Sequence, residues 1–206
     1  RRQRQMCIRD RELIINVTSN EITIALFEDK QLVELNKEKC KTGFAVGDIY
    51  LGKVKKIMPG LNAAFVNVGY EKDAFIHYLD LGPQFTTQQK LVNILTNNKK
   101  IPNFETMRLD KAMGKNGKIS GFIASGQSIL VQIAKEAIST KGPRLTCDMS
   151  LAGRNVVLIP FSNKVSISQK IRSAEERKRL KRIASEVLPN NYGVIIRLSL
   201  IHISEP

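Results

Sequence analysis

The residues with the clearest chemical content lie between positions 62 and 77, where two phenylalanines fall on polar strand faces. The segments NAAFVNV (62–68) and AFIH (74–77) are rich in strand-forming residues, and alternate residues of a strand share a face. Alternation places Phe65 beside Asn67 and Phe75 beside His77, opposite the small apolar residues that suit a core. Two aromatic rings on a polar strand face predict a surface that can stack flat ligands.

A hairpin with residues 69–73 as its loop would join the apolar faces of these two segments. The expected cross-strand pairs are Val68–Ala74, Asn67–Phe75, Val66–Ile76 and Phe65–His77. This register puts the rings of Phe65 and Phe75 on a diagonal, roughly 7 Å apart. The alternative is that both rings are ordinary core residues, packed under the segment 83–122 or against a neighbouring unit.

Stacking surfaces beside positive charge suit single-stranded nucleic acid. Every base has a π-face, and stacking on an aromatic side chain contributes about 1–3 kcal/mol per base. The lysines Lys53, Lys55 and Lys56 lie on the preceding strand, where they could hold phosphates. We therefore expect a binding face for single-stranded RNA or DNA, built from rings and cations.

The overall charge agrees with a polyanionic partner. The chain of 206 residues has 33 Lys and Arg against 19 Asp and Glu, a net charge of +14. Such an excess favours nucleic acid or an anionic membrane surface. A further alternative is a basic docking surface for a protein or a membrane, but the interleaved aromatics favour nucleic acid.

Other classes of protein are disfavoured. No apolar run is long enough to span a bilayer and no signal peptide is visible, so we expect a cytoplasmic protein. The cysteines Cys7, Cys40 and Cys147 lack zinc-ligand spacing, so no metal site is expected among them.

The elements that would position the rings are short strands. A small antiparallel meander is expected first, at 12–17, 21–27 and 31–35. The predicted barrel strands are 46–57, 62–68, 74–77, 128–134 and 144–149. Residues 83–122 are polar and predict a mobile excursion from the barrel, with one short helix around 91–95.

The last third of the chain mixes strands with one helix. Strands are expected at 155–160, 165–168 and 193–197. Between them, Ser173 and Glu176 have capping-box spacing, and apolar residues follow at helical spacing to position 188. The pattern as a whole predicts an α+β fold, a small β-barrel flanked on both sides by pieces of a second α/β unit.

Both ends differ from the rest. Residues 1–11 (RRQRQMCIRDR) and 199–206 (SLIHISEP) resemble translated sequencing-adapter read-through, and neither continues the period of its neighbour. We expect these segments to contribute nothing to folding and the natural protein to continue beyond residue 198.

Four ordered segments resemble the ribonuclease E/G family. They are GDIYLGKVKKIMPGLNAAFVNVGYEKDAFIH, QSILVQIAKEAISTKGPRLTCDMSLAGRNVVLIP, SISQKI and NYGVIIR. The resemblance covers roughly residues 12–198. It implies an RNase H-like subdomain that is split by an inserted five-stranded OB-fold β-barrel. The implied divisions are 12–42 for the first RNase H-like part, 43–150 for the OB-fold and 151–198 for a 5′-sensor region with the return to the RNase H-like part.

The resemblance also implies roles for individual residues. Phe65 and Phe75 match RNA-contacting aromatics, and Lys141 matches a lysine that helps hold RNA. Val157 and Arg197 match a pocket that senses a 5′-monophosphate, for which a planar guanidinium is suited. Leu198 stands where the family usually has Thr.

The implied activity is Mg²⁺-dependent cleavage of single-stranded RNA in RNA processing and decay, carried out by a later nuclease domain. No paired-aspartate motif occurs here, so we expect this chain to bind RNA without cutting it. Oligomers are expected only of the full-length protein. The alternative function is a stand-alone OB-fold RNA-binding module without catalysis.

Overall fold

The computed structural model describes residues 11–39, 44–97 and 102–197. The chain divides into two compact units, one up to residue 43 and one from residue 44 onward. Among the described residues, no helix combines the length and the apolar character needed to cross a membrane.

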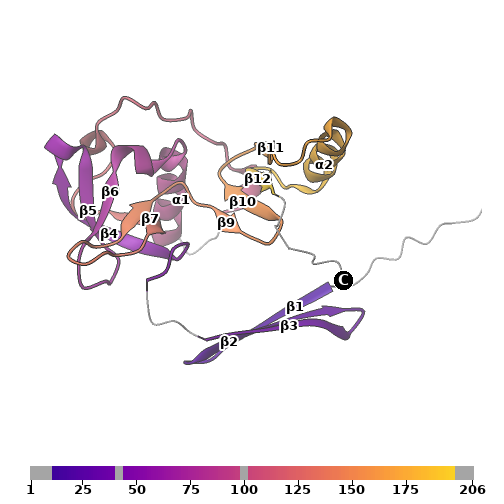
Figure 1. Cartoon of the computed structure of the whole chain (residues 1–206). Helices are drawn as coiled ribbons and strands as arrows, with labels where there is room; N and C mark the ends of the chain where they lie inside the picture. Colours follow the sequence, from indigo (N-terminus) through magenta and orange to yellow (C-terminus); the bar gives the residue numbers. More distant parts are fainter. Residues whose placement is uncertain (1–10, 40–43, 98–101, 198–206) are drawn as a thin grey trace, which may run out of the picture. The chain divides into compact units, whose positions relative to one another are not determined.

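The first unit is a three-stranded antiparallel sheet in the order β1-β2-β3 (Figure 1). Its strands are β1 (Arg11–Val17), β2 (Glu21–Glu28) and β3 (Gln31–Lys39). Asp29 and Lys30, both with positive φ, make the tight turn between β2 and β3. The expected meander is thus confirmed. It begins one residue earlier than expected, because Arg11, which was assigned to the adapter-like end, belongs to β1 and pairs with Glu28. The rest of both adapter-like ends lies outside the described residues.

The second unit is built around a closed barrel of five strands, in the order β4-β5-β6-β8-β7 (Figure 1). The strands are β4 (Ile49–Met58), β5 (Ala63–Asn67), β6 (Ala74–His77), β7 (Ser128–Lys135) and β8 (Arg144–Thr146). Inward-facing residues fill the barrel, and the fully buried ones include Val66, Ile76, Ile129, Val131 and Leu145. Closure leaves no free edge among these strands.

The described residues of the segment 83–122 form no barrel strand and pack on the barrel, while the expected mobility of this excursion stays a prediction. Helix α1 (Phe85–Asn97) lies against β7, and Gln89 donates a hydrogen bond to the Ser128 carbonyl. Phe85 and Ile119 of this segment belong to the buried core. The polar composition of the segment concealed this packing, because the polar residues Thr87 and Gln88 are buried along with the apolar ones.

A second sheet follows the barrel, in the order β11-β12-β10-β9. Its strands are β9 (Leu151–Ala152), β10 (Val156–Pro160), β11 (Val165–Ile167) and β12 (Tyr192–Ile196). Asn191 connects this sheet to the 102–107 segment, since its side-chain amide donates to the carbonyls of Phe104 and Met107, each at 2.7 Å.

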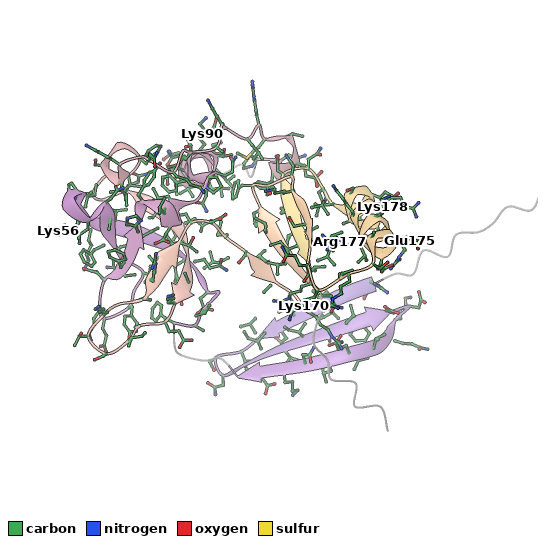
Figure 2. All side chains as sticks on the ribbon, turned by 45° about the horizontal axis from the view of Figure 1, so that its top comes forward. Lys56, Lys90, Lys170, Glu175, Arg177 and Lys178 are labelled. Atoms are coloured by element: carbon green, nitrogen blue, oxygen red, sulfur yellow. The ribbon has the colours of Figure 1, made fainter. Side chains whose placement is uncertain are left out.

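Helix α2 (Ala174–Val187) packs beside β11. Ser173 caps it by accepting a hydrogen bond from the Glu176 amide, but the Glu176 carboxylate pairs with Arg179, so only half of the predicted capping box forms. Arg177, labelled in Figure 2, donates to the carbonyls of Ile167, Ser168 and Ile171. This arginine is therefore committed to holding α2 against the end of β11.

The architecture confirms the expected α+β class and the five-stranded, OB-like barrel. The RNase H-like nature of the flanking parts and the domain boundaries stay predictions.

Candidate functional site

Phe65 and Phe75 lie directly opposite each other on β5 and β6. Their ring centroids are 6.0 Å apart and the rings meet edge to face, at 70°. Both rings are partly exposed, whereas Val66 and Ala74, the next pair along the hairpin, are fully buried. The predicted alternation is confirmed, and the two rings stand on the outer face of the barrel.

The register of this hairpin differs from the expected one by two residues. Val66 pairs with Ala74, where Val68 was expected to do so, and Phe75 faces Phe65 instead of Asn67. The reason is local, because the Asn67 side chain accepts a hydrogen bond from the Gly69 amide at 2.8 Å and starts the loop two residues early. A shift of two keeps every side chain on its face, so the rings came closer without changing sides.

The two rings line an open pocket of about 660 Å³. Three cationic side chains share its lining, those of Lys72, Lys141 and Arg144. The remaining lining residues are Asp73, Thr140 and Gly142. The pocket therefore combines an aromatic floor with positive charge, the combination that stacks bases and holds phosphates.

The loop between β7 and β8 closes one side of this pocket. Ile138 and Lys141 exchange backbone hydrogen bonds, and the Lys72 ammonium group donates to the Ser139 carbonyl at 2.8 Å. Gly142 lies so close to the Asp73 backbone that a Cβ atom at this position would stand 2.2 Å from the Asp73 oxygen. These contacts hold exposed Lys141 at the rim of the pocket.

The lysines of β4 occupy different places. A β-bulge lies between Val54 and Lys56, which leaves both Lys55 and Lys56 exposed. The Lys55 ammonium group pairs with the Asp73 carboxylate at 2.9 Å and thus reaches the pocket lining. Lys53 pairs with Asn67 of β5 and does not line the pocket. Of the five expected RNA-binding residues, Phe65, Phe75 and Lys141 come together, Lys55 reaches their edge and Lys53 stands apart.

Sequence reasoning missed Lys72 and Arg144, which also line the pocket. Arg144 begins the three-residue strand β8 and pairs with Phe75. A signal was present, because Arg144 follows Lys141 closely in TKGPRLT. The strand was expected, but its parallel pairing with β6 depends on a contact between distant segments.

Val157 in β10 and Arg197, the residue after β12, lie close together. Val157 pairs with Ile195, and the Arg197 amide donates to the Asn155 carbonyl, so Val157 and Arg197 are diagonal neighbours on one face. The Arg197 guanidinium donates to the Gly153 carbonyl at 2.7 Å and is exposed. Leu198, the position that departs from the family pattern, lies outside the described residues.

The described residues contain no group of three or more His, Cys, Asp or Glu side chains that could hold a metal ion. Cys147 is buried, and burial together with the nearby Asp80 and Asp148 carboxylates raises its pKa well above the usual range. Cys7 and Cys40 lie outside the described residues.

Comparisons with known proteins agree on one family. The Ribonuclease E/G family matches residues 150–205. Ribonuclease G of Haemophilus influenzae is 37% identical over 194 residues, covering 94% of this chain and 36% of the relative. Ribonuclease G of Escherichia coli K12 is 33% identical, with 94% of this chain and 36% of the relative covered.

A third relative carries the other name of the family. Ribonuclease E of Nostoc sp. PCC 7120 is 38% identical over 175 residues, which cover 84% of this chain and 21% of the relative. The chain thus spans between about a fifth and about a third of the length of these relatives.

Proposed function

Because the chain belongs to the ribonuclease E/G family, we propose that it is the RNA-binding, N-terminal part of a bacterial endoribonuclease that cleaves single-stranded RNA. The relatives named ribonuclease support the class of reaction and support RNA as the substrate. In such an endoribonuclease, this chain would bind the RNA that is processed or degraded.

The observation that carries this proposal is the pocket of Phe65 and Phe75. Paired bases in a duplex hide their faces, so a surface that offers aromatic rings selects unpaired nucleotides. Lys72, Lys141 and Arg144 line the same pocket as the rings, where they could hold phosphates on either side of a stacked base. Stacking tolerates every base, which suits a protein that must hold many RNA sequences.

The chemical step is proposed for a part of the protein outside this chain. Mg²⁺-assisted hydrolysis needs carboxylates that converge on the ion, and the described acidic residues do not fit this need. The residues of this chain would bind and orient the RNA strand.

Val157 and Arg197 are proposed to contact the 5′-monophosphate of the bound strand. Their shared face and the exposed guanidinium of Arg197 support this role. One nitrogen of that guanidinium already donates to Gly153, which would fix its plane for a phosphate on the open side.

The proposal is tested by equilibrium binding of a fluorescent single-stranded RNA, measured by anisotropy. We expect binding that weakens with salt, and much weaker binding of a duplex of the same sequence. The double variant Phe65→Ala/Phe75→Ala should lose most of the affinity. Phe122→Ala is the matched control, because Phe122 is a partly exposed ring on the same unit that does not line the pocket.

Equal affinity for duplex and single strand, or an unaffected double variant, would contradict the proposal. Cleavage of RNA by the purified chain with Mg²⁺ would contradict the proposal that the chemical step lies outside this chain. A complete protein that bound RNA and never cut it would leave the stand-alone RNA-binding module as the function.

A further inference from the structure

The strand pairing aligns charged and aromatic side chains in one row across the barrel. Lys56 pairs with Phe65, Phe65 with Phe75, Phe75 with Arg144, and Arg144 with Lys135. Paired residues of neighbouring strands project from the same face. The row therefore runs from β4 to β7 with two rings in the middle and cations at both ends, and Figure 2 labels Lys56 at the β4 end.

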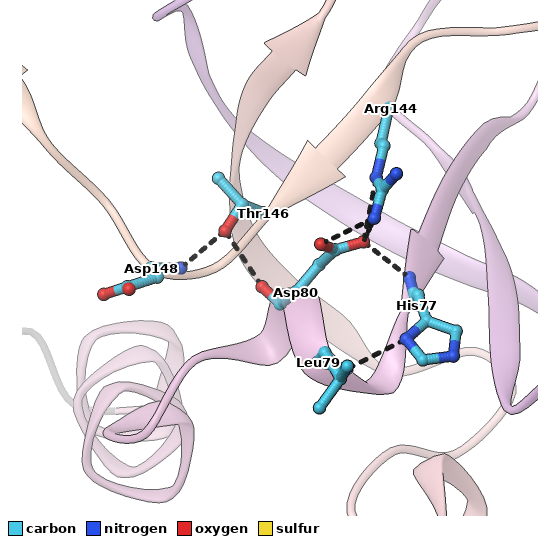
Figure 3. A network of polar contacts seen from close by, with 6 residues as sticks. All are labelled: His77, Leu79, Asp80, Arg144, Thr146 and Asp148. Atoms are coloured by element: carbon cyan, nitrogen blue, oxygen red, sulfur yellow. Dashed lines mark hydrogen bonds and ion pairs between the residues drawn. The ribbon is translucent and has the colours of Figure 1, made fainter. Parts of the chain in front are cut away.

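Arg144 differs from the other cations of the row because its guanidinium group is fixed. Its Nε and Nη2 atoms donate to the two carboxylate oxygens of Asp80, at 3.1 and 3.0 Å (Figure 3). A fork of two parallel hydrogen bonds sets the plane of the guanidinium group as well as its position. Within the described residues, no hydrogen bond uses the remaining Nη1 atom, so this donor stays available at the pocket.

Asp80 is itself held in place by several contacts (Figure 3). Its carboxylate accepts a hydrogen bond from the His77 amide at 3.1 Å. Its carbonyl accepts from the Thr146 hydroxyl at 3.0 Å and from the Cys147 amide at 2.7 Å. The Asp80 side chain is 19% exposed, against 45% for Arg144. A rigid, mostly buried carboxylate thus supports an arginine that reaches solvent.

We propose that Arg144 binds a backbone phosphate of single-stranded RNA next to the base stacked on Phe75, and that Asp80 is its positioning residue. This inference rests on the RNA-binding function proposed above and adds two residues to it. The phosphate would meet the Nη1 side of the guanidinium group, opposite the side that Asp80 occupies. Asp80 contributes geometry only, because its negative charge by itself repels RNA.

Because of that repulsion, charge and positioning predict opposite changes in RNA affinity when the carboxylate is neutralised. Asp80→Asn removes one negative charge beside the RNA, so charge alone predicts tighter binding. Positioning predicts the opposite, because the neutral amide no longer holds the fork. We expect Asp80→Asn to weaken single-stranded RNA binding by about threefold to fivefold without changing the salt dependence, since no phosphate-binding cation is lost.

Variants of the arginine complete the experiment. Arg144→Ala should weaken binding about tenfold, as expected for a charge-assisted hydrogen bond, and lower the slope of log K against log salt by about 0.7. Arg144→Lys should keep the slope and still lose severalfold in affinity. In the Arg144→Ala background, Asp80→Asn should cause no further loss, because there is nothing left to position.

The matched control is Asp110→Asn, which removes the same charge from an ion pair with Lys90 on α1. Its affinity should equal that of the unaltered chain or rise slightly. Melting curves and circular dichroism confirm that each variant is folded.

If Asp80→Asn binds as tightly as Asp110→Asn, the positioning role is wrong. If Arg144→Ala binds normally while Phe65→Ala/Phe75→Ala does not, only this inference fails. If the unaltered chain does not bind RNA, the proposed function itself fails.

Discussion

Replacing Gly142 by alanine tests whether the close approach of two loops shapes the pocket. The added Cβ atom would stand 2.2 Å from the Asp73 carbonyl oxygen and 3.0 Å from that of Lys72. Ordinary contact begins at 3.4 Å, so the two backbones must separate by about 1 Å. Backbone atoms cannot rotate aside like the end of a side chain. We expect a loss of about 1–3 kcal/mol in the free energy of unfolding, as for other overpacked sites.

The separation should also weaken RNA binding, because Lys141 precedes Gly142 and Asp73 holds Lys55. Urea denaturation would give the stability and fluorescence anisotropy the affinity for single-stranded RNA. The control is Gly60→Ala, since a Cβ atom at Gly60 meets nothing within 4 Å. If Gly142→Ala has the stability and affinity of Gly60→Ala, the close contact of Gly142 with Asp73 does not shape the pocket.

Three further predictions address charge, pH and a buried amide. Lys141→Ala should weaken RNA binding and reduce the salt slope by about 0.7, measured by anisotropy between 50 and 300 mM salt, roughly the range where counterion release dominates. Burial raises the pKa of Asp148, so the folded state disfavours its charged form. Asp148→Asn should therefore raise the melting temperature at neutral pH, a gain that should vanish as the pH falls below the ordinary pKa of aspartate, measured by calorimetry. Asn191→Ala leaves the partly buried carbonyls of Phe104 and Met107 without their donor and should cost about 1–3 kcal/mol of stability in urea denaturation.

Strand positions and faces could be predicted from the sequence because they depend on neighbouring residues. The alternation in residues 62–77 identified Phe65 and Phe75 as outward-facing, and burial confirms it. The register was wrong by two residues, because it is set by the Asn67 side chain at the start of the loop. A register shift of two residues leaves each side chain on the same face of its strand, so Phe65 and Phe75 still lie together on the outer face.

Contacts between distant segments could not be predicted in the same way. The polar segment 83–122 gave no sign that Ile119 would be fully buried, since its neighbours are Lys, Gly and Ser. Arg144 reaches the pocket only through the parallel pairing of β8 with β6. Its partner Asp80 lies 64 positions earlier in the sequence. The spacing of neighbouring residues in the sequence does not indicate such a pair, because the closure of the barrel brings the two residues together.

The most direct test of the central claim is to locate bound RNA on the protein. A single-stranded RNA with one photoreactive 4-thiouridine would be bound to the chain and crosslinked by light, and the modified peptide would be sequenced by mass spectrometry. We expect crosslinks at Phe65, Phe75 or the loop that carries Lys141, competed away by unlabelled single strand and not by duplex. Crosslinks confined to the β1–β3 sheet or to α2, with the pocket unmodified, would show that the pocket is not the RNA-binding site.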